Sequence, residues 1–386
     1  VKKDVIPARR LHTIAIMVTG VVIGYASHAA IVIRSMADTP MDQNSPDNVF
    51  SLKYYLNREQ YGDTPLFYGQ TYNAPVKLEV KGNMCIPVEK KGHAQYAPAP
   101  KVDGEKDRYV VTGYKTSYEF MDEFKMLFPR MHSSQGHHVD AYKSWADVKG
   151  KRIRYDYCGQ KKTEYCPTFG ENLRFFFRYQ VNFMYWRYFM WNFAGRQNDI
   201  QSHGDLTKGN WISGIPFIDN AMLGDQSKLP SELRENKGHN VYYMLPLLLG
   251  IIGLCWQFSK RNNEGKNKEG YRSFAIVFLL FFLTGLAIVV YLNQTPYQPR
   301  ERDYAYAGSF YAFCIWIGLG VMAIIDMFNQ AVKNEKARTA VAAAAVLVTM
   351  LVPAQMASQN WDDHDRSNRY AARDFGANYL KSCDKE

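Results

Sequence analysis

Long apolar runs without charged side chains constrain this chain more than any other feature. Residues 14–33 contain no Asp, Glu, Lys or Arg, and about 20 such residues form a helix that can cross the roughly 30 Å hydrocarbon core of a bilayer. Four further runs of this kind cover 241–258, 274–292, 310–325 and 340–356. They predict a mainly α-helical, polytopic membrane protein with about five transmembrane helices. Buried helices of a large soluble core are the alternative.

Basic side chains lie next to these runs. The 386-residue chain has 47 Lys and Arg against 37 Asp and Glu, a balance that can indicate a nucleic-acid-binding protein. Here much of the excess lies beside the apolar runs, where Lys and Arg mark cytoplasmic flanks. The flanking residues are Lys2, Lys3, Arg9 and Arg10, then Lys260, Arg261, Lys266, Lys268 and Arg272, and then Lys333, Lys336 and Arg338. We therefore expect membrane lipids as partners and no nucleic acid.

The positions of these flanks predict one topology. Residues 1–36 form a cytoplasmic flank and the first transmembrane helix, so that 37–240 is an extracytoplasmic domain inserted after that helix. Residues 241–356 form a transmembrane region of four helices, and 357–386 form an extracytoplasmic tail. The connection after residue 292 also lies outside, because its two Arg residues are offset by two acids.

The large domain has the pattern of a mixed α/β fold. A short amphipathic helix is expected over 49–56, with Ser45 or Asp47 able to cap it. Strand character is concentrated at 76–80, 109–112 and 152–155, between Gly, Pro and Lys turns. Residues 86–107 are rich in Pro and Lys and are expected to form an exposed loop.

Residues 172–193 form an aromatic helix interrupted by Arg174, Arg178 and Arg187. Three Arg residues make a crossing of the bilayer costly. The pattern fits a helix in the headgroup plane, with its rings at the boundary and its Arg residues at the phosphates. A core helix of the extracytoplasmic domain is the equal alternative.

The cysteines of the large domain suggest one disulfide. Cys158 and Cys166 are close in sequence and lie on the predicted outer side, where thiols are oxidised in bacteria and in the secretory pathway. A bridge between them would close a short loop. Cys85 competes for either partner.

A histidine-rich segment is the candidate for a metal site. His132, His137, His138 and Asp140 supply the ligand types that zinc prefers. Their spacing matches no known ligand pattern, and Ser133 to Gly136 reads as a loop. We therefore expect a solvated loop and no bound metal.

The polar segment before the fourth run combines charge and aromatic rings. Arg300 and Arg302 alternate with Glu301 and Asp303, and Tyr304 follows. Arg is suited to bidentate phosphate recognition, and lipid phosphates lie at this depth. An interfacial anchor with local salt bridges is the structural alternative.

Three further Arg residues lie in polar stretches near the ends of predicted elements. Arg34 ends the first run, Arg58 lies in a dense polar stretch, and Arg196 follows the aromatic helix. All three are on the predicted outer side. They are secondary candidates for the same polar site.

Several long stretches resemble a known family. They are PMDQNSPDNVF at 40–50, LNREQYGDTPLFYG at 56–69, YWRYFMWNFAGRQND at 185–199, GNWISGI at 209–215 and QPRERDYAYAGSFYAFCIWIGL at 298–319. The chain is similar to bacterial polytopic membrane proteins, formerly a domain of unknown function, that are grouped with GT-C-type glycosyltransferases. Animal relatives of that family are protein O-mannosyltransferases of the secretory pathway. The resemblance covers nearly the whole chain and is weakest between about 80 and 165.

The resemblance implies a glycosyltransferase in the bacterial inner membrane, with its large domain in the periplasm. The donor would be a polyprenyl-phosphate sugar, in particular mannose, and the acceptor a Ser or Thr of an exported protein. Arg300 and Arg302 would bind the donor phosphate, with Glu301, Asp303 and Tyr304 shaping the site. Arg34, Arg58 and Arg196 are second choices. No cofactor is implied beyond the lipid-linked donor.

The catalytic residue of that family has no match in this chain. The family places its acid before the first run seen here, and Asp38 and Asp42 follow that run, so they do not replace it. We therefore expect this chain to be a fragment of a longer protein, without that protein's N-terminal part. A non-catalytic membrane scaffold or export-complex subunit is the alternative function.

Overall fold

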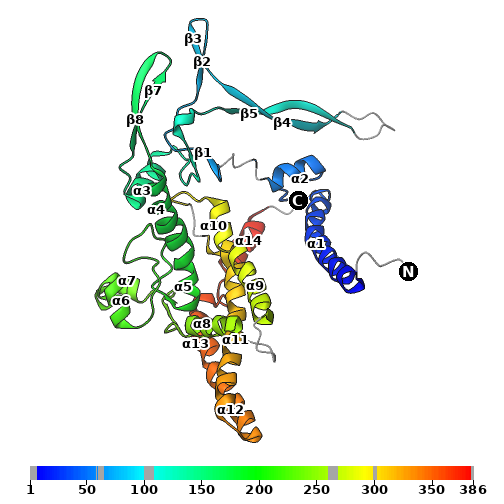
Figure 1. The fold of residues 1–386 in the computed structure, drawn as a ribbon, viewed down its shortest axis with the longest axis vertical. Helices are drawn as coiled ribbons and strands as arrows, with labels where there is room; N and C mark the ends of the chain where they lie inside the picture. Colours follow the sequence, from blue (N-terminus) through cyan, green and yellow to red (C-terminus); the bar gives the residue numbers. More distant parts are fainter. Residues whose placement is uncertain are drawn as a thin grey trace. The chain divides into compact units, whose positions relative to one another are not determined.

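The computed structural model describes residues 7–57, 59, 65–99, 108–259, 268–298 and 302–383, and these are mainly helical (Figure 1). The chain forms two compact units. Unit 1 consists of Val1–Pro65 and Pro75–Met121, and unit 2 of Leu66–Ala74 and Asp122–Glu386. The segment 37–240, predicted as one domain, is therefore divided between the two units.

In the described part of the chain, four helices are long and apolar enough to cross a membrane. They are Ala8–Ser35, Gly270–Leu292, Asp303–Ala331 and Glu335–His364. The remaining run forms a shorter helix, α8 (Leu245–Ser259), of 15 residues. At 1.5 Å per residue α8 is about 22 Å long, which is less than the hydrocarbon thickness of a bilayer. The prediction of five spanning helices is thus supported for four, and the chain is compatible with a multi-pass membrane protein.

In unit 1, a long exposed helix precedes a short one. The first, α1 (Ala8–Ser35), buries only Ser35. The second, α2 (Val49–Leu56), has the predicted bounds. Its N-cap is Asn48, whose side-chain oxygen accepts the N–H groups of Phe50 and Ser51 at 3.0 Å. The predicted cap by Ser45 or Asp47 is therefore wrong.

Two antiparallel hairpins complete unit 1. One pairs β2 (Leu78–Lys81) with β3 (Met84–Pro87), and the other pairs β4 (Glu89–Pro98) with β5 (Tyr109–Tyr118). The described part of the predicted loop 86–107 is therefore largely strand. The register of β4 on β5 shifts between Lys91 and Ala94 and again between Gln95 and Tyr96. Such bulges break the side-chain alternation by which a strand is recognised in sequence.

The described residues of unit 2 form three short antiparallel pairs. β1 (Tyr68–Gln70) pairs with β6 (Lys125–Leu127), β7 (Lys151–Tyr157) with β8 (Gln160–Cys166), and β9 (Gly195–Arg196) with β10 (Asn240–Val241). Its helices before α8 are α3 (Gly136–Ala146), α4 (Phe169–Phe175), α5 (Arg187–Phe193), α6 (Pro216–Leu223) and α7 (Ser231–Arg234). Those after α8 are α9 (Lys268–Leu283), α10 (Leu286–Leu292), α11 (Ala307–Ala331), α12 (Glu335–Thr349), α13 (Leu351–His364) and α14 (Ala371–Ser382).

The aromatic segment is one continuous helix through the core of unit 2. It begins as α4, continues as the π-helix η3 (Phe176–Trp186) and ends as α5. Thr168 and Glu171 form a reciprocal capping box at its start. Much of it is buried, including Phe175, Tyr188 and Arg187. This burial favours the core-helix alternative over a helix lying in the headgroup plane.

Glycines bring α8 and α11 into close contact (Figure 1). A Cβ at Gly253 would overlap the carbonyl oxygen of Trp316, and one at Gly320 would overlap the carbonyl oxygen of Leu249. The Trp316 indole N–H donates to Gln257 Oε1 at 2.8 Å across this contact. Close backbone approach at small residues is the usual packing device of membrane helices.

The predicted Cys158–Cys166 bridge is wrong. Cys166 is a buried free thiol, whereas Cys158 and Cys85 are disulfide-bonded cysteines. Cys158 lies in the turn of the β7–β8 hairpin, and Cys166 pairs with Lys151 at the opposite end. Seven residues of strand separate the two ends by about 20 Å, and a disulfide needs Cα atoms within about 7 Å.

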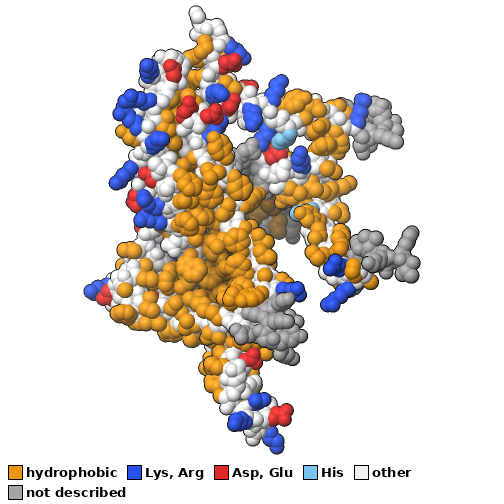
Figure 2. All heavy atoms as spheres, viewed as in Figure 1, with side chains coloured by type: hydrophobic (Ala, Val, Ile, Leu, Met, Phe, Trp, Pro, Cys, Tyr) orange, Lys and Arg blue, Asp and Glu red, His pale blue; other side chains and the backbone are white. Residues whose placement is uncertain are grey.

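The face of the molecule in Figure 2 has hydrophobic side chains over much of its helical part. Lys and Arg gather on the β7–β8 hairpin and near the end of α12 that begins at Glu335. Exposed large apolar side chains of α9 and α11 include Leu279 and Tyr311. A broad exposed apolar surface of this kind fits lipid as its solvent.

Candidate functional site

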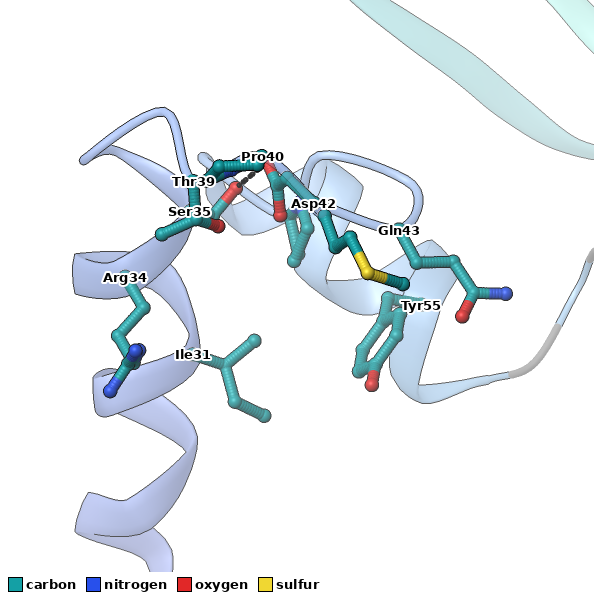
Figure 3. Close-up of a pocket in the computed structure, with 10 residues that line it drawn as sticks. Ile31, Arg34, Ser35, Thr39, Pro40, Asp42, Gln43 and Tyr55 are labelled. Atoms are coloured by element: carbon teal, nitrogen blue, oxygen red, sulfur yellow. Dashed lines mark hydrogen bonds between the residues drawn. The ribbon is translucent and has the colours of Figure 1, made fainter. Parts of the chain in front are cut away.

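An open pocket lies where α1 ends, within unit 1 (Figure 3). Its volume is about 570 Å³, and we call it the α1 pocket. Figure 3 shows Ile31 and Arg34 of α1 on one side and Tyr55 of α2 on the other. Pro40 and Asp42, from the segment between the helices, lie above them in this view.

Unusual backbone conformations flank the residues 39–43 that line the α1 pocket. Asp38, Asn44 and Ser45 have φ angles of 50°, 65° and 37°. Non-glycine residues adopt this left-handed region at a cost, and such residues cluster at functional sites. The segment between α1 and α2 is therefore held in a specific shape.

Of the two charged side chains of the α1 pocket, Asp42 has a hydrogen-bond partner, whereas Arg34 has no ion-pair partner among the described residues. Asp42 Oδ2 accepts a hydrogen bond of 2.7 Å from the hydroxyl of buried Ser35. Arg34 is exposed and forms no ion pair with any residue that the structure describes. Arg34 also lies in the last turn of α1, where the helix dipole favours a cation. The pocket thus offers an uncompensated guanidinium at the end of an apolar helix.

The first-choice phosphate residues lie at the start of another candidate spanning helix, in unit 2. Arg300 and Glu301 are outside the described residues. Arg302 is half-buried, and its Nε has no hydrogen-bond partner among the described atoms. Asp303 and Tyr304 are exposed, and the Asp303 carboxylate accepts the Tyr304 N–H at 2.9 Å.

The remaining secondary candidates are Arg58 and Arg196. Arg58 lies outside the described residues. Arg196 donates to Asp363 Oδ2 at 2.5 Å and to the Gly238 carbonyl at 2.7 Å, so its guanidinium is already engaged. Nearby Asn198 is fully buried and accepts the Gly209 N–H at 2.8 Å. These residues of the 195–199 stretch therefore hold loops together.

The histidine segment is partly helical. His137, His138 and Asp140 belong to α3, so the predicted loop ends at Gln135. His138 Nδ1 lies 2.9 Å from the Ser133 hydroxyl. Burial, then nearby Arg130 and His138, lowers the pKa of His132, which keeps this imidazole neutral at pH 7. Among the described residues, no three potential ligands are grouped closely enough to hold a metal ion.

A buried Arg that sequence reasoning missed connects three segments of unit 2. Arg130 is fully buried and donates to the carbonyls of Leu66 at 2.9 Å and Val290 at 3.1 Å. Its guanidinium lies 3.8 Å from the centre of the Phe128 ring. Burial lowers its pKa to about 10. Nothing in its neighbourhood in sequence marks it, because its partners are backbone carbonyls far along the chain.

Comparisons with known proteins add one match. A family of unknown function (DUF8416) matches residues 62–177, which is less than half of the chain. No curated protein and no solved structure matches the chain. The matched segment includes the region where the glycosyltransferase resemblance is weakest, and the matched family carries no stated activity. The glycosyltransferase resemblance therefore stays a prediction.

Proposed function

We propose that this chain is part of a GT-C-type glycosyltransferase of the bacterial inner membrane. It would move a sugar, in particular mannose, from a polyprenyl-phosphate donor to Ser or Thr of exported proteins. The α1 pocket of unit 1 would receive the donor phosphate on Arg34. Arg302 of unit 2 is a separate candidate for phosphate binding. The large domain would lie in the periplasm.

One observation carries this proposal: Arg34 lines an open pocket, without an ion-pair partner in the described structure, at the end of a helix that could span a membrane. A lipid phosphate lies at the end of such a helix, and Arg is well suited to binding it. In the reaction, the leaving lipid phosphate gains negative charge, which a nearby guanidinium stabilises. No described residue is assigned as the base.

The test uses membranes that contain the complete gene product. With polyprenyl-phosphate mannose and an exported acceptor, mass spectrometry of the acceptor should find a hexose on Ser or Thr. Arg34→Ala should lower the rate about 10- to 100-fold, the effect of losing one charge-assisted contact. Arg10→Ala removes an equally exposed Arg near the other end of α1 and should leave the rate unchanged.

Two results would contradict the proposal. Wild-type rates in both Arg34→Ala and Arg302→Ala would remove the phosphate-binding role of these residues. An acceptor that never gains a hexose, although donor and complete gene product are present, would contradict the enzyme itself.

A second candidate is a non-catalytic scaffold or export-complex subunit. The engaged state of Arg196 favours it, because a secondary candidate for the polar site serves to anchor α13 through Asp363. Deletion of the gene would then disrupt a membrane assembly while the glycosylation of exported proteins stays unchanged. The glycosylation profile of the deletion strain separates the two functions.

A further inference from the structure

Unit 1 has a second pocket, between α2 and strand β4, which we call the β4 pocket. Its volume is about 320 Å³. This is near the lower end of the range for small-molecule sites, which is about 300–1,000 Å³. Phe50 and Tyr54 line it from α2, and His93, Gln95 and Tyr96 line it from β4.

Aromatic rings form one part of the β4 pocket. Phe50 and Tyr96 are stacked, with ring centres 4.5 Å apart and planes 24° apart. Phe50 also packs against Tyr109 of β5 at 4.8 Å, which fixes the pair in place. Tyr96 is nevertheless 45% exposed and Tyr54 39%. The pocket thus presents flat, partly uncovered rings that a ligand can stack on.

A carboxylate and an imidazole form the polar part. Glu59 also lines the pocket, its side chain is 8% exposed, and its Oε2 lies 3.2 Å from His93 Nε2 and 3.8 Å from Lys115 Nζ. Asn57 donates to the other oxygen at 3.3 Å. In the tautomer whose Nε2–H donates to this carboxylate, the other ring nitrogen, Nδ1, carries a lone pair. His93 can therefore accept a hydrogen bond from a ligand hydroxyl.

We propose that the β4 pocket binds a pyranose sugar. A pyranose has an apolar C–H face that stacks on an aromatic ring and a rim of hydroxyls that exchange hydrogen bonds with His93 and Gln95. A purely apolar ligand would leave these polar groups unpaired, which costs free energy. Glu59 is a positioning residue, since it acts by orienting His93.

Sugar binding by the β4 pocket does not depend on the proposed function. Only the role of the bound sugar in the transfer reaction rests on it. The β4 pocket would hold either the sugar of the donor or a sugar already on the acceptor. Binding of a free sugar can be measured without any transfer reaction, so failure of one proposal is distinguishable from failure of the other.

The experiment is saturation-transfer NMR on the full chain in a zwitterionic detergent, because detergents with sugar headgroups would compete. Methyl α-mannopyranoside and methyl α-glucopyranoside are the probes, and mannitol, which has similar hydroxyls but no ring, is the control ligand. Signal transfer to the ring C–H protons of at least one pyranoside is expected, with little or none to mannitol.

Matched variants locate the binding. Tyr96→Ala should weaken binding about tenfold, the effect of losing an aromatic contact, and His93→Ala should weaken it as well. Tyr96→Phe keeps the ring and should retain binding. Tyr118→Ala, an exposed Tyr of β5 that does not line the pocket, and Glu89→Gln on β4 are the controls. If Tyr96→Ala prevents folding, Tyr54→Ala tests the same pocket from α2.

Three outcomes would overturn the inference. The first is no signal transfer to either pyranoside, and the second is equal signal transfer to mannitol. The third is unchanged pyranoside binding both in His93→Ala and in the folded aromatic variant, which is Tyr96→Ala or, if that does not fold, Tyr54→Ala. If pyranosides bind as expected but no hexose reaches an acceptor, the sugar site stands and the proposed transfer reaction fails.

Discussion

The carboxylate of Glu171 acts by accepting backbone N–H groups. Glu171 is buried at the start of α4 and accepts the N–H groups of Lys149 at 2.7 Å, Gly150 at 3.1 Å and Thr168 at 2.7 Å. Burial by itself raises the pKa of this carboxyl, but the hydrogen bonds from Thr168, Lys149 and Gly150 outweigh it, so the pKa lies below the ordinary value of 4.5.

The lowered pKa of Glu171 predicts a pH dependence of stability. Because the folded state favours the ionised carboxylate, its stabilisation is fully present above the unfolded value near 4.5 and is lost as pH falls through the folded value. Glu171→Gln should lower the free energy of unfolding at pH 7 by about 1–3 kcal/mol and reduce the acid-induced loss. Thermal unfolding at pH 7 and at pH 4 measures both effects.

The control for this prediction is Glu164→Gln, an exposed carboxylate of β8 in the same part of unit 2. Its unfolding temperature should match that of the unsubstituted protein at both pH values. An equal loss in the two variants would mean that the hydrogen bonds at Glu171 contribute no more than general surface charge.

At the scale of helices, glycines decide where packing is close. Gly253→Ala places a methyl group against the backbone of Trp316 on α11, where nothing flexible can move away. We expect the free energy of unfolding to fall by about 1–3 kcal/mol, the usual cost of overpacking. Thermal unfolding in detergent, followed by circular dichroism, measures the change.

Gly318→Ala on α11 is the matched control, because no described atom lies within 4 Å of a Cβ there. This change should be neutral or stabilising by up to about 1 kcal/mol, since Ala favours helix over Gly. Equal destabilisation by both substitutions would show that the α8–α11 contact is not the cause.

The sequence predicts helices and strands better than it predicts the tertiary contacts between them. The bounds of α2 follow from its local apolar pattern, whereas β4 was missed because its bulges and its Lys residues hide the alternation. Gly20 and Gly24 have the small-xxx-small spacing of a packing motif, yet no described atom lies near a Cβ at either position. Which glycine meets a neighbour depends on the tertiary arrangement, and the spacing alone does not contain it.

For the candidate site, too, the sequence indicates individual polar residues but not which of them lie together. Arg34 and Asp42 were recognisable as polar residues after an apolar run, but their place in one pocket depends on the turn from Asp38 to Ser45. The ion pair of Arg196 could not be predicted, because its partner Asp363 lies 167 residues further along the chain. Long-range ion pairs of this kind leave no local signal in a sequence.

At the scale of the whole molecule, the topology depends on whether α8 crosses the bilayer. Its 15 residues are short, but the basic residues that follow it predict a cytoplasmic end. A short span can be accommodated by local thinning of the bilayer. We therefore expect α8 to cross, which places Gln298 outside the cytoplasm.

Reporter fusions test this topology. Alkaline phosphatase fused after Gln298 should be active, since it folds only outside the cytoplasm, and a fusion after Ser259 should be inactive. Activity in the reverse pattern would mean that α8 enters and leaves the bilayer on one side, and would place Arg302 away from a periplasmic lipid phosphate.

The candidate span Gly270–Leu292 consists of two pieces, α9 and α10, that meet at Gly285. A Cβ at Gly285 would lie 2.6 Å from Ser309 Oγ and 2.7 Å from the Tyr185 hydroxyl, so the joint is wedged against two other helices. The carbonyl of Val290, on the second piece, holds Arg130. A change in membrane thickness that displaced the short second piece would therefore reach the buried guanidinium of Arg130 through the Val290 carbonyl.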